Sequence, residues 1–210
     1  MKKISYLDTH DLRIKYYSII LEGTLENIKG IPLPTPYKFV FYKKGDMDAW
    51  IDIEMSAKEI TDKEQGIKVF NEYFGKFENE LPKRMIFIED ENGKKIATAS
   101  AYFDPFFKDK SGDGYLHWVA VAKEYQGKGL AYPLITHTLN IMKNLGYTRC
   151  KITTQTNTWL ACKLYLNLGF KPNKENAKEN YKGYQILNTI LDDENLKEFG
   201  KLDIDEIYNQ

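Results

Sequence analysis

The chain has 210 residues, 42% apolar and 14% aromatic, which is too rich for a disordered chain and suits one large domain with a real core. Its 30 basic and 30 acidic residues cancel, and a net charge of zero argues against nonspecific binding to nucleic acid or to a membrane surface. Cys150 and Cys162 offer neither a disulfide framework nor metal-ligand spacing, so we expect buried, reduced thiols and no metal.

No stretch reads as a membrane span or a secretory signal. The longest uncharged run, Gly129 to Met142, is too short and too polar to cross a bilayer. The basic start of the chain is not followed by an apolar segment. We therefore expect a cytoplasmic protein with no membrane partner.

The beginning of the chain is the hardest part to interpret. Leu12 to Leu21 is rich in Ile and Tyr and is expected to be a strand. The alternate prolines of Ile31 to Pro36 predict an extended connector. A strand is expected at Lys38 to Tyr42, and Trp50 to Glu54 is expected to be a short extended stretch.

A helix and a hairpin follow. Thr61 to Glu64 resembles a capping box, and the apolar residues behind it recur at the three- and four-residue spacing of an amphipathic helix. Two strands are then expected, at Arg84 to Glu89 and at Lys95 to Phe103, joined by a turn with Asn92-Gly93 at its centre.

The second half of the chain has a different pattern of apolar residues. The near-continuous apolar run Tyr115 to Val121 is typical of a strand buried on both faces. The elements expected after it are a glycine-containing loop at Gln126 to Ala131, a helix from Leu130 to Gly146, a strand at Arg149 to Gln155, a helix capped by Asn157 or Thr158 and ending at Leu168, a late strand at Tyr184 to Leu191, and an acidic tail from Asp192.

This order of elements predicts an α/β fold with a mixed sheet. The first half is hairpin-like and antiparallel, whereas strand–loop–helix–strand implies a parallel pair joined by a right-handed crossover. We expect an N-terminal extension over residues 1–36, a single domain over 37–191, and an acidic tail over 192–210 that packs on the domain or trails from it.

The glycine loop has the construction of a phosphate site. A buried strand ends, Gly127 and Gly129 follow, and a helix begins, so that backbone N–H groups without helical partners meet the positive end of the helix dipole. The sequence lacks the P-loop pattern G-x-x-x-x-G-K-[ST] and the Rossmann pattern G-x-G-x-x-G. Taken alone, the two glycines are better explained by an ordinary strand–helix turn.

A second motif lies one strand and one helix later. The loop reads Gln126-x-x-Gly129-x-Ala131, and the later helix carries Ala161-x-x-Leu164-Tyr165-x-x-x-Gly169-Phe170. Together the two motifs resemble the GNAT superfamily of acetyl-CoA-dependent N-acetyltransferases, in which the first is Q/R-x-x-G-x-G/A and the second is A-x-x-L-Y-x-x-x-G-F. The resemblance implies a GNAT-like fold in which the parallel strand pair splays apart.

The resemblance also implies roles for individual residues. Tyr165 matches the tyrosine that often protonates the leaving thiolate; with the whole motif in place this role is favoured over the alternative, an aromatic packing residue on an amphipathic helix. Thr158 stands where the family often has Asn, with Asn157 one position earlier, and either is expected to bond the pantetheine arm. The residues expected to bind acetyl-CoA are Val119, Val121, Gln126, Gly127, Lys128, Gly129, Leu130, Ala131, Tyr132, Asn157 and Thr158.

His117 is the candidate general base. By strict alternation it shares a strand face with Val119 and Val121, and an ordinary imidazole pKa suits proton removal from an amine. A core histidine is the equally weighted alternative. The candidates for the acceptor site are Trp50, Tyr102, Phe103, Asp104 and Trp118. For Asp104 a turn-capping role before proline is favoured, and for the tryptophans a core position.

The sequence thus predicts an N-acetyltransferase that moves an acetyl group from acetyl-CoA to a primary amine, in a complex that holds both substrates. The acceptor is expected to be a small molecule or a peptide, with no nucleic-acid partner and no metal, and the protein a monomer or homodimer. The alternative is a noncatalytic module with the same fold that binds or senses acyl-CoA.

Overall fold

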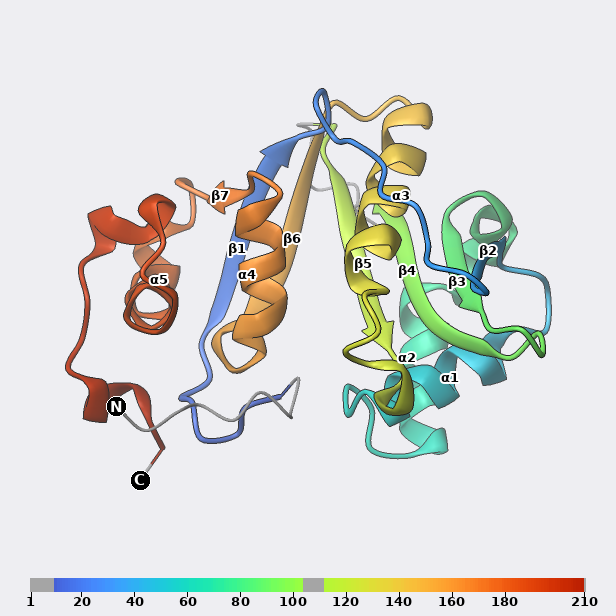
Figure 1. Cartoon of the computed structure of the whole chain (residues 1–210), viewed down its shortest axis with the longest axis horizontal. Coiled ribbons are helices and arrows are strands. Elements are labelled where there is room, and N and C mark those ends of the chain that lie inside the picture. Colours follow the sequence, from blue (N-terminus) through green and yellow to red (C-terminus); the bar gives the residue numbers. More distant parts are fainter. Residues whose placement is uncertain (1–9, 104–111, 210) are drawn as a thin grey trace. The chain divides into compact units, whose positions relative to one another are not determined.

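The computed structural model describes residues 10–103 and 112–209. Figure 1 shows the arrangement of helices and strands, and the contacts divide the chain into two compact units. Residues 24–150 make up one, called the central unit below; the described parts of 1–23 and 151–210 make up the other, called the terminal unit. The expected domain division at residues 36 and 191 stays a prediction.

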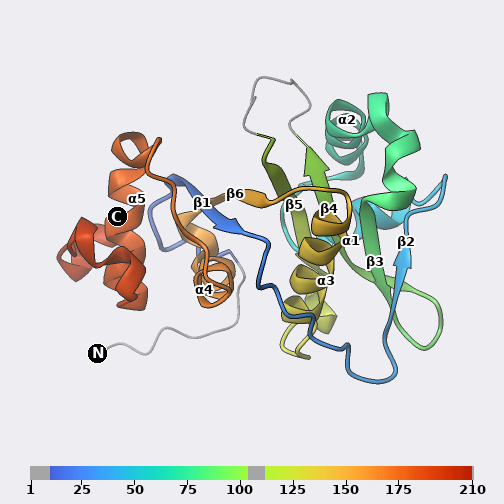
Figure 2. The same ribbon diagram turned by 90° about the horizontal axis from the view of Figure 1, so that it is seen from above.

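The central unit is built on an antiparallel sheet with helices on both faces. Its elements are β2 (Lys38–Phe41), α1 (Met47–Ser56), α2 (Lys63–Tyr73), a 3₁₀ segment (Gly75–Lys83), β3 (Met85–Glu89), β4 (Lys95–Phe103), β5 (Gly114–Val121), a 3₁₀ turn (Lys123–Tyr125) and α3 (Ala131–Asn144). The pairs β2–β3, β3–β4 and β4–β5 are all antiparallel, which confirms the expected hairpin-like first half. Figure 2 shows α3 on one side of these strands and α2 on the other.

Side-chain alternation along β4 explains this layering. Tyr102 packs its ring on Phe74 at the end of α2, with ring centroids 5.5 Å apart, and donates its hydroxyl hydrogen to the Tyr73 carbonyl oxygen. The opposite face carries small residues such as Ala97 and Ala99, against which α3 packs. His137 of α3 stacks on Phe39 of β2 with ring centroids 4.0 Å apart.

The next strand, β6 (Arg149–Gln155), begins beside β5. The Arg149 guanidinium lies 3.4 Å from the Asp113 carboxylate, just before β5, and the Cys150 thiol bonds the backbone of Leu116. The two strands therefore start side by side and run in the same direction, as the crossover rule predicts.

The terminal unit contains the remainder of β6, then β1 (Ser18–Thr24), β7 (Lys171–Pro172), α4 (Trp159–Asn167) and α5 (Ala177–Leu191). The β1 strand begins at Ser18, later than the expected Leu12, and pairs antiparallel with β7. Helix α5 packs on β1 through Gly183, where an added Cβ would lie 2.5 Å from the Ile19 side chain. Tyr184 of α5 donates its hydroxyl hydrogen to the Ile20 carbonyl oxygen over 2.6 Å.

Two expected elements are wrong. Trp50 to Glu54 belongs to helix α1, because the buried residues Trp50, Ile51, Ile53 and Glu54 follow the spacing of one helical face and not the alternation of a strand. The late strand at Tyr184 to Leu191 is the second half of helix α5.

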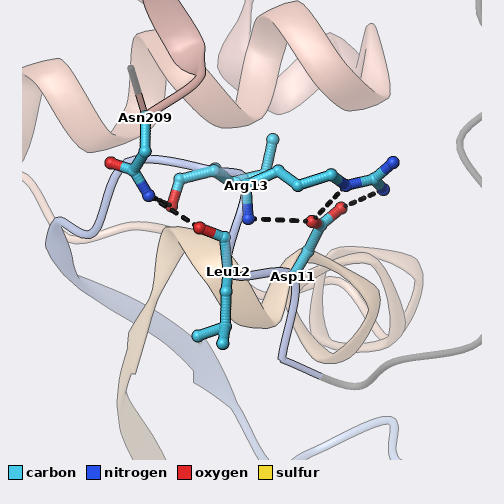
Figure 3. Close-up of polar contacts among 5 residues, drawn as sticks. Asp11, Leu12, Arg13 and Asn209 are labelled. Atoms are coloured by element: carbon cyan, nitrogen blue, oxygen red, sulfur yellow. Dashed lines mark hydrogen bonds and ion pairs between the residues drawn. The ribbon is translucent and has the colours of Figure 1, made fainter.

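The tail after α5 is packed rather than loose. Its 3₁₀ turns, Glu194–Phe199 and Ile204–Ile207, bury Leu196, Phe199 and Ile207. Figure 3 shows how Asn209 holds the segment that precedes β1: its side-chain amide donates to the Leu12 carbonyl oxygen over 2.7 Å. In the same segment the Arg13 guanidinium pairs with the Asp11 carboxylate at 2.7 Å, which lowers the pKa of that carboxyl.

Candidate functional site

The loop between β5 and α3 exposes its backbone. Gly127 and Gly129 have φ of +76° and +75°, conformations that residues with a side chain rarely adopt. Apart from the glycine itself and its chain neighbours, no atom of residues 10–103 and 112–209 lies within 4 Å of a Cβ added at either position. The helical hydrogen-bond ladder of α3 starts where the Leu134 N–H donates to the Leu130 carbonyl oxygen over 3.1 Å. The N–H groups before Leu134 stand at the positive end of the helix and precede that ladder.

Side chains around the loop hold it in place. The Tyr125 hydroxyl donates to the Asp90 carboxylate over 2.8 Å, and this partner raises the pKa of Tyr125 to about 12. The Lys128 ammonium lies 4.7 Å from the centre of the Tyr125 ring. The Gln126 side-chain amide donates to the Val121 carbonyl oxygen over 2.9 Å and ties the loop to the end of β5. The loop is thus shaped by contacts that leave its glycine backbone open.

This geometry fits a pyrophosphate. Open space beside two left-handed glycines lets an anion approach the backbone closely, and Lys128, which is exposed, adds positive charge. The residues expected to bind acetyl-CoA in the central unit lie together along β5, the loop and the first turn of α3: Val119, Val121, Gln126, Gly127, Lys128, Gly129, Leu130, Ala131 and Tyr132. Their role in binding stays a prediction.

A bulge in β5 changes the position of His117. In the register with β4, Thr98 faces Ala120 and Ser100 faces His117, so two residues of β5, Trp118 and Val119, stand opposite Ala99 alone. Trp118 takes up the extra residue with φ of +50°. Strict alternation fails at such a bulge, and the expectation that His117 shares a face with Val119 and Val121 is wrong.

His117 instead faces the α1–α2 side of the sheet. Its ring lies 5.0 Å from the ring of Tyr73 and 5.3 Å from that of Tyr102, measured between centroids. Removal from water in these aromatic surroundings lowers the pKa of His117 to about 4, so the imidazole is neutral near pH 7. A neutral imidazole can accept a proton, although a pKa this low makes it a weaker base than an ordinary histidine.

The terminal unit carries the other expected site residues. The Thr158 hydroxyl donates to the Gln155 carbonyl oxygen over 2.9 Å and lies 3.1 Å from the Thr154 hydroxyl oxygen, so it already has local partners. The buried Asn157 amide oxygen has no partner among residues 10–103 and 112–209. Of the two, Asn157 is the better placed to bond a ligand.

Tyr165 lies on α4 and is buried, with 5% of its surface exposed. The turn after it is formed by Gly169, at φ of +90°, and the Phe170 N–H donates to the Tyr165 carbonyl oxygen over 3.1 Å. Phe170 lies 3.2 Å from the position of a Cβ on Gly23 in β1. The second motif therefore fixes the end of α4 against β1, and the role of the Tyr165 hydroxyl stays a prediction.

The remaining candidates are two buried thiols, four aromatic side chains and Asp104. Burial raises the pKa of both Cys150 and Cys162 to about 12, as suits unreactive buried thiols. Trp50, Tyr102 and Trp118 belong to the core cluster between α1, α2 and the sheet, and Asp104 lies outside the described residues. Phe103 packs edge-on to Phe77, with centroids 4.9 Å apart.

Sequence reasoning missed Glu54. This residue of α1 is fully buried, and burial together with the nearby Glu59 raises the pKa of its carboxyl well above the ordinary value. Glu54 lies one helical turn after Trp50 on the apolar face of α1. That spacing indicates a buried position only when the segment is taken as a helix. Among the described residues there is no cluster of three or more side chains suited to a metal ion, and no helix long and apolar enough to cross a membrane.

Several solved structures share the fold. A GCN5-related N-acetyltransferase from Sphaerobacter thermophilus aligns with 77% of this chain and 49% of its own, at a TM-score of 0.58 and 15% identity. A GNAT-family acetyltransferase from Colwellia psychrerythraea aligns with 77% of this chain and 55% of its own, at a TM-score of 0.55 and 18% identity. At these identities the likeness shows a common mixed α/β fold.

Sequence comparisons identify the family. The curated N-alpha-acetyltransferase 30 of Schizosaccharomyces pombe is 37% identical over 57 residues, which are 27% of this chain and 38% of that protein. The model of the acetyltransferase (GNAT) family matches residues 47–170, a span that holds α1 to α4 and both motifs. By this match over more than half of its length, the chain belongs to the GNAT acetyltransferase family.

Proposed function

We propose that the protein transfers an acetyl group from acetyl-CoA to a primary amine held beside it. The observation that carries the proposal is the loop Gln126-x-x-Gly129-x-Ala131, whose two left-handed glycines leave open space next to N–H groups at the start of α3. Membership of the GNAT family supports the same reaction class.

Residues of the central unit hold the donor in this proposal. The N–H groups from Gly127 to Tyr132 donate to the pyrophosphate, and Lys128 adds charge. The backbone of Val119, at the bulge of β5, pairs with the pantetheine arm and offers an N–H to the carbonyl oxygen of the thioester. Val121 contributes less through its carbonyl oxygen, which Gln126 already occupies. Bound acetyl-CoA supplies an acetyl group activated as a thioester.

Protons move at two side chains. An amine must lose a proton before it attacks, and the neutral imidazole of His117 accepts one directly or through water. The Tyr165 hydroxyl donates a proton to the sulfur of the departing coenzyme A thiolate, and the Asn157 amide oxygen bonds the pantetheine arm. His117 and Tyr165 are thus the proposed catalytic residues.

Two measurements test the proposal. Acetyl-CoA should raise the melting temperature, because a ligand of the native state stabilises it by mass action. Free thiol should then appear on addition of amines from a panel of small amines and peptide N-termini. Stabilisation with no thiol release on any amine would favour the noncatalytic acyl-CoA-binding module, and no stabilisation would contradict both functions.

A further inference from the structure

The central unit buries a carboxyl group without a partner. Glu54 of α1 is 0% exposed, and neither of its carboxyl oxygens has a hydrogen-bond partner among residues 10–103 and 112–209. Native proteins satisfy the great majority of their buried polar groups, and an unpaired buried acid is among the most expensive to keep. Such a group calls for an explanation.

Four more polar atoms in the same unit share this property. The indole nitrogens of Trp50 and Trp118 and the hydroxyl oxygens of Thr98 and Ser100 are buried and have no partner in the described part of the chain. With Glu54 these residues are called the buried polar cluster below.

The five side chains face one layer. Glu54 follows Trp50 by one helical turn and so lies on the same side of α1, and the Trp50 ring is 5.2 Å from the Trp118 ring of β5. Thr98 and Ser100 alternate with Tyr102 along β4 and share its face, which is the face that packs on α2. The cluster therefore occupies the layer between helices α1 and α2 and strands β4 and β5.

One edge of the cluster reaches the bulge of β5. Ser100 stands opposite His117, and His117, Trp118 and Val119 are each partly exposed. Aromatic rings line this edge, since the Trp118 ring lies 5.5 Å from the Tyr73 ring and 5.7 Å from the His117 ring. Rings of this kind attract cations through their faces.

The chemistry of the cluster suits an ammonium group. A carboxylate and two hydroxyl oxygens can each accept one of its three hydrogens, and the two indole N–H groups can donate to the carboxylate. The charge that acts on Glu54 comes from Glu59, which is also acidic. On the facing elements, His117, with its pKa lowered to about 4 by burial, Tyr73 and Tyr102 are the titratable side chains. An anion would find no positive charge among these groups.

We propose that Glu54 is the counter-charge for a second amino group of the acceptor, so that the substrate class is a small aliphatic diamine. The inference rests on the proposed function. An ammonium ion paired with a carboxylate stays protonated and cannot attack a thioester, so the reacting nitrogen is a different one, near His117 and Val119. Glu54 is a specificity-determining residue, and binding proceeds by loss of its carboxyl proton to solvent as the ammonium group takes its place.

Thermal shifts with simple probes test this. The probes are 1,4-diaminobutane and butylamine at equal ionic strength, on the wild type, on Glu54→Gln and on the control Asp52→Asn, which removes an exposed carboxylate from the same helix. We expect saturating diamine to raise the melting temperature of the wild type and the control by at least about 3 °C. Butylamine should do much less, and Glu54→Gln should lose the response to diamine.

Each other result overturns the inference. A diamine response that survives in Glu54→Gln, or one that butylamine matches, would show that Glu54 does not select a second amino group. No response to either amine in the wild type would mean that the cluster holds buried water only. Acetyl-CoA is added separately to all three proteins. If it does not stabilise them, the proposed function is contradicted. The response to diamine is judged independently of that result.

A measurement on the wild type covers the case in which Glu54→Gln fails to fold. Burial raises the pKa of the Glu54 carboxyl and a bound ammonium group lowers it again, so diamine binding should release protons to the buffer. Titration calorimetry in two buffers with different ionisation enthalpies counts them. Binding without proton release would overturn the role of Glu54.

Discussion

The start of α3 allows one substitution to separate ligand binding from stability. Gly129→Glu places a side chain and a negative charge beside the N–H groups proposed to bind pyrophosphate. Because the new Cβ meets open space among the described residues, its strain comes from φ of +75° and not from steric overlap. A residue with a side chain in this conformation costs about 1–2 kcal/mol, or about 2–8 °C in melting temperature for a chain of this size.

The effect on binding should be larger and of a different kind. At ~5 Å and an effective dielectric between about 20 and 80, the repulsion between the new carboxylate and each phosphate charge is about 1–3 kcal/mol. Each such charge corresponds to roughly a 5- to 150-fold loss of affinity. We therefore expect acetyl-CoA to stabilise the wild type and to leave the melting temperature of Gly129→Glu unchanged at the same concentration.

Gly146→Glu is the matched control. Gly146 lies at the other end of α3, has φ of +96°, and likewise has open space around an added Cβ. It should lose a similar amount of stability and keep the full response to acetyl-CoA. The reasoning is refuted if Gly129→Glu binds acetyl-CoA as tightly as the wild type, or if Gly146→Glu loses binding to the same extent.

Three further predictions concern single side chains. Tyr165→Phe should keep stability and acetyl-CoA affinity and lower kcat by roughly 100-fold, measured as thiol release; a wild-type rate would assign the proton donation to water. If His117 is the base, the acidic limb of the pH–rate profile should lie near its pKa of about 4 and flatten in His117→Gln, whereas an unchanged profile would leave His117 a packing role. Glu54→Met should stabilise the protein more at pH 8 than at pH 4: the folded-state pKa of Glu54 is raised, so its contribution to stability is fully present below the ordinary carboxyl pKa and is lost as pH rises towards the folded value. Thermal melts at the two pH values check this, and an equal gain at both would show that Glu54 does not titrate on unfolding.

Strong local signals made much of the fold predictable. The strands at Lys95–Phe103 and Arg149–Gln155 have the expected bounds, and the turn between β3 and β4 contains Asn92 and Gly93, with Gly93 at φ of +80°. The glycine loop is predicted because two glycines stand between a buried apolar strand and the start of an amphipathic helix. These features depend on residues that are close together in the chain.

The errors come from features that depend on distant residues. Helices α1 and α5 contain short apolar runs that fit a strand as well as a helix, and only their packing partners decide between the two. The bulge at Trp118 is defined by counting residues against β4, which no single strand reveals. His117 therefore appeared on the wrong face, and Glu54 could not be recognised as buried while α1 was read as extended.

The division of the chain has a consequence for the order of folding. The central unit is one continuous stretch, residues 24–150, whereas the terminal unit needs both ends of the chain. The bond from the Lys15 ammonium to the Glu206 carbonyl oxygen joins residues 191 positions apart, and that from Asn209 to Leu12 spans 197. Contacts of such long range form slowly, because a large loop must close before they stabilise anything.

On a growing chain, then, the central unit with its glycine loop can fold as soon as residue 150 is available, while β1 lacks its partner β7 until residue 172 has been synthesised. Pulsed hydrogen exchange during refolding should find amides of β3 and β4 protected before those of β1, and the opposite order would contradict this sequence of events. The terminal unit begins with the first residues of the chain and is completed by the last ones, and it carries Tyr165. A cell that degrades incomplete chains would thus remove molecules in which the glycine loop has formed and the terminal unit has not.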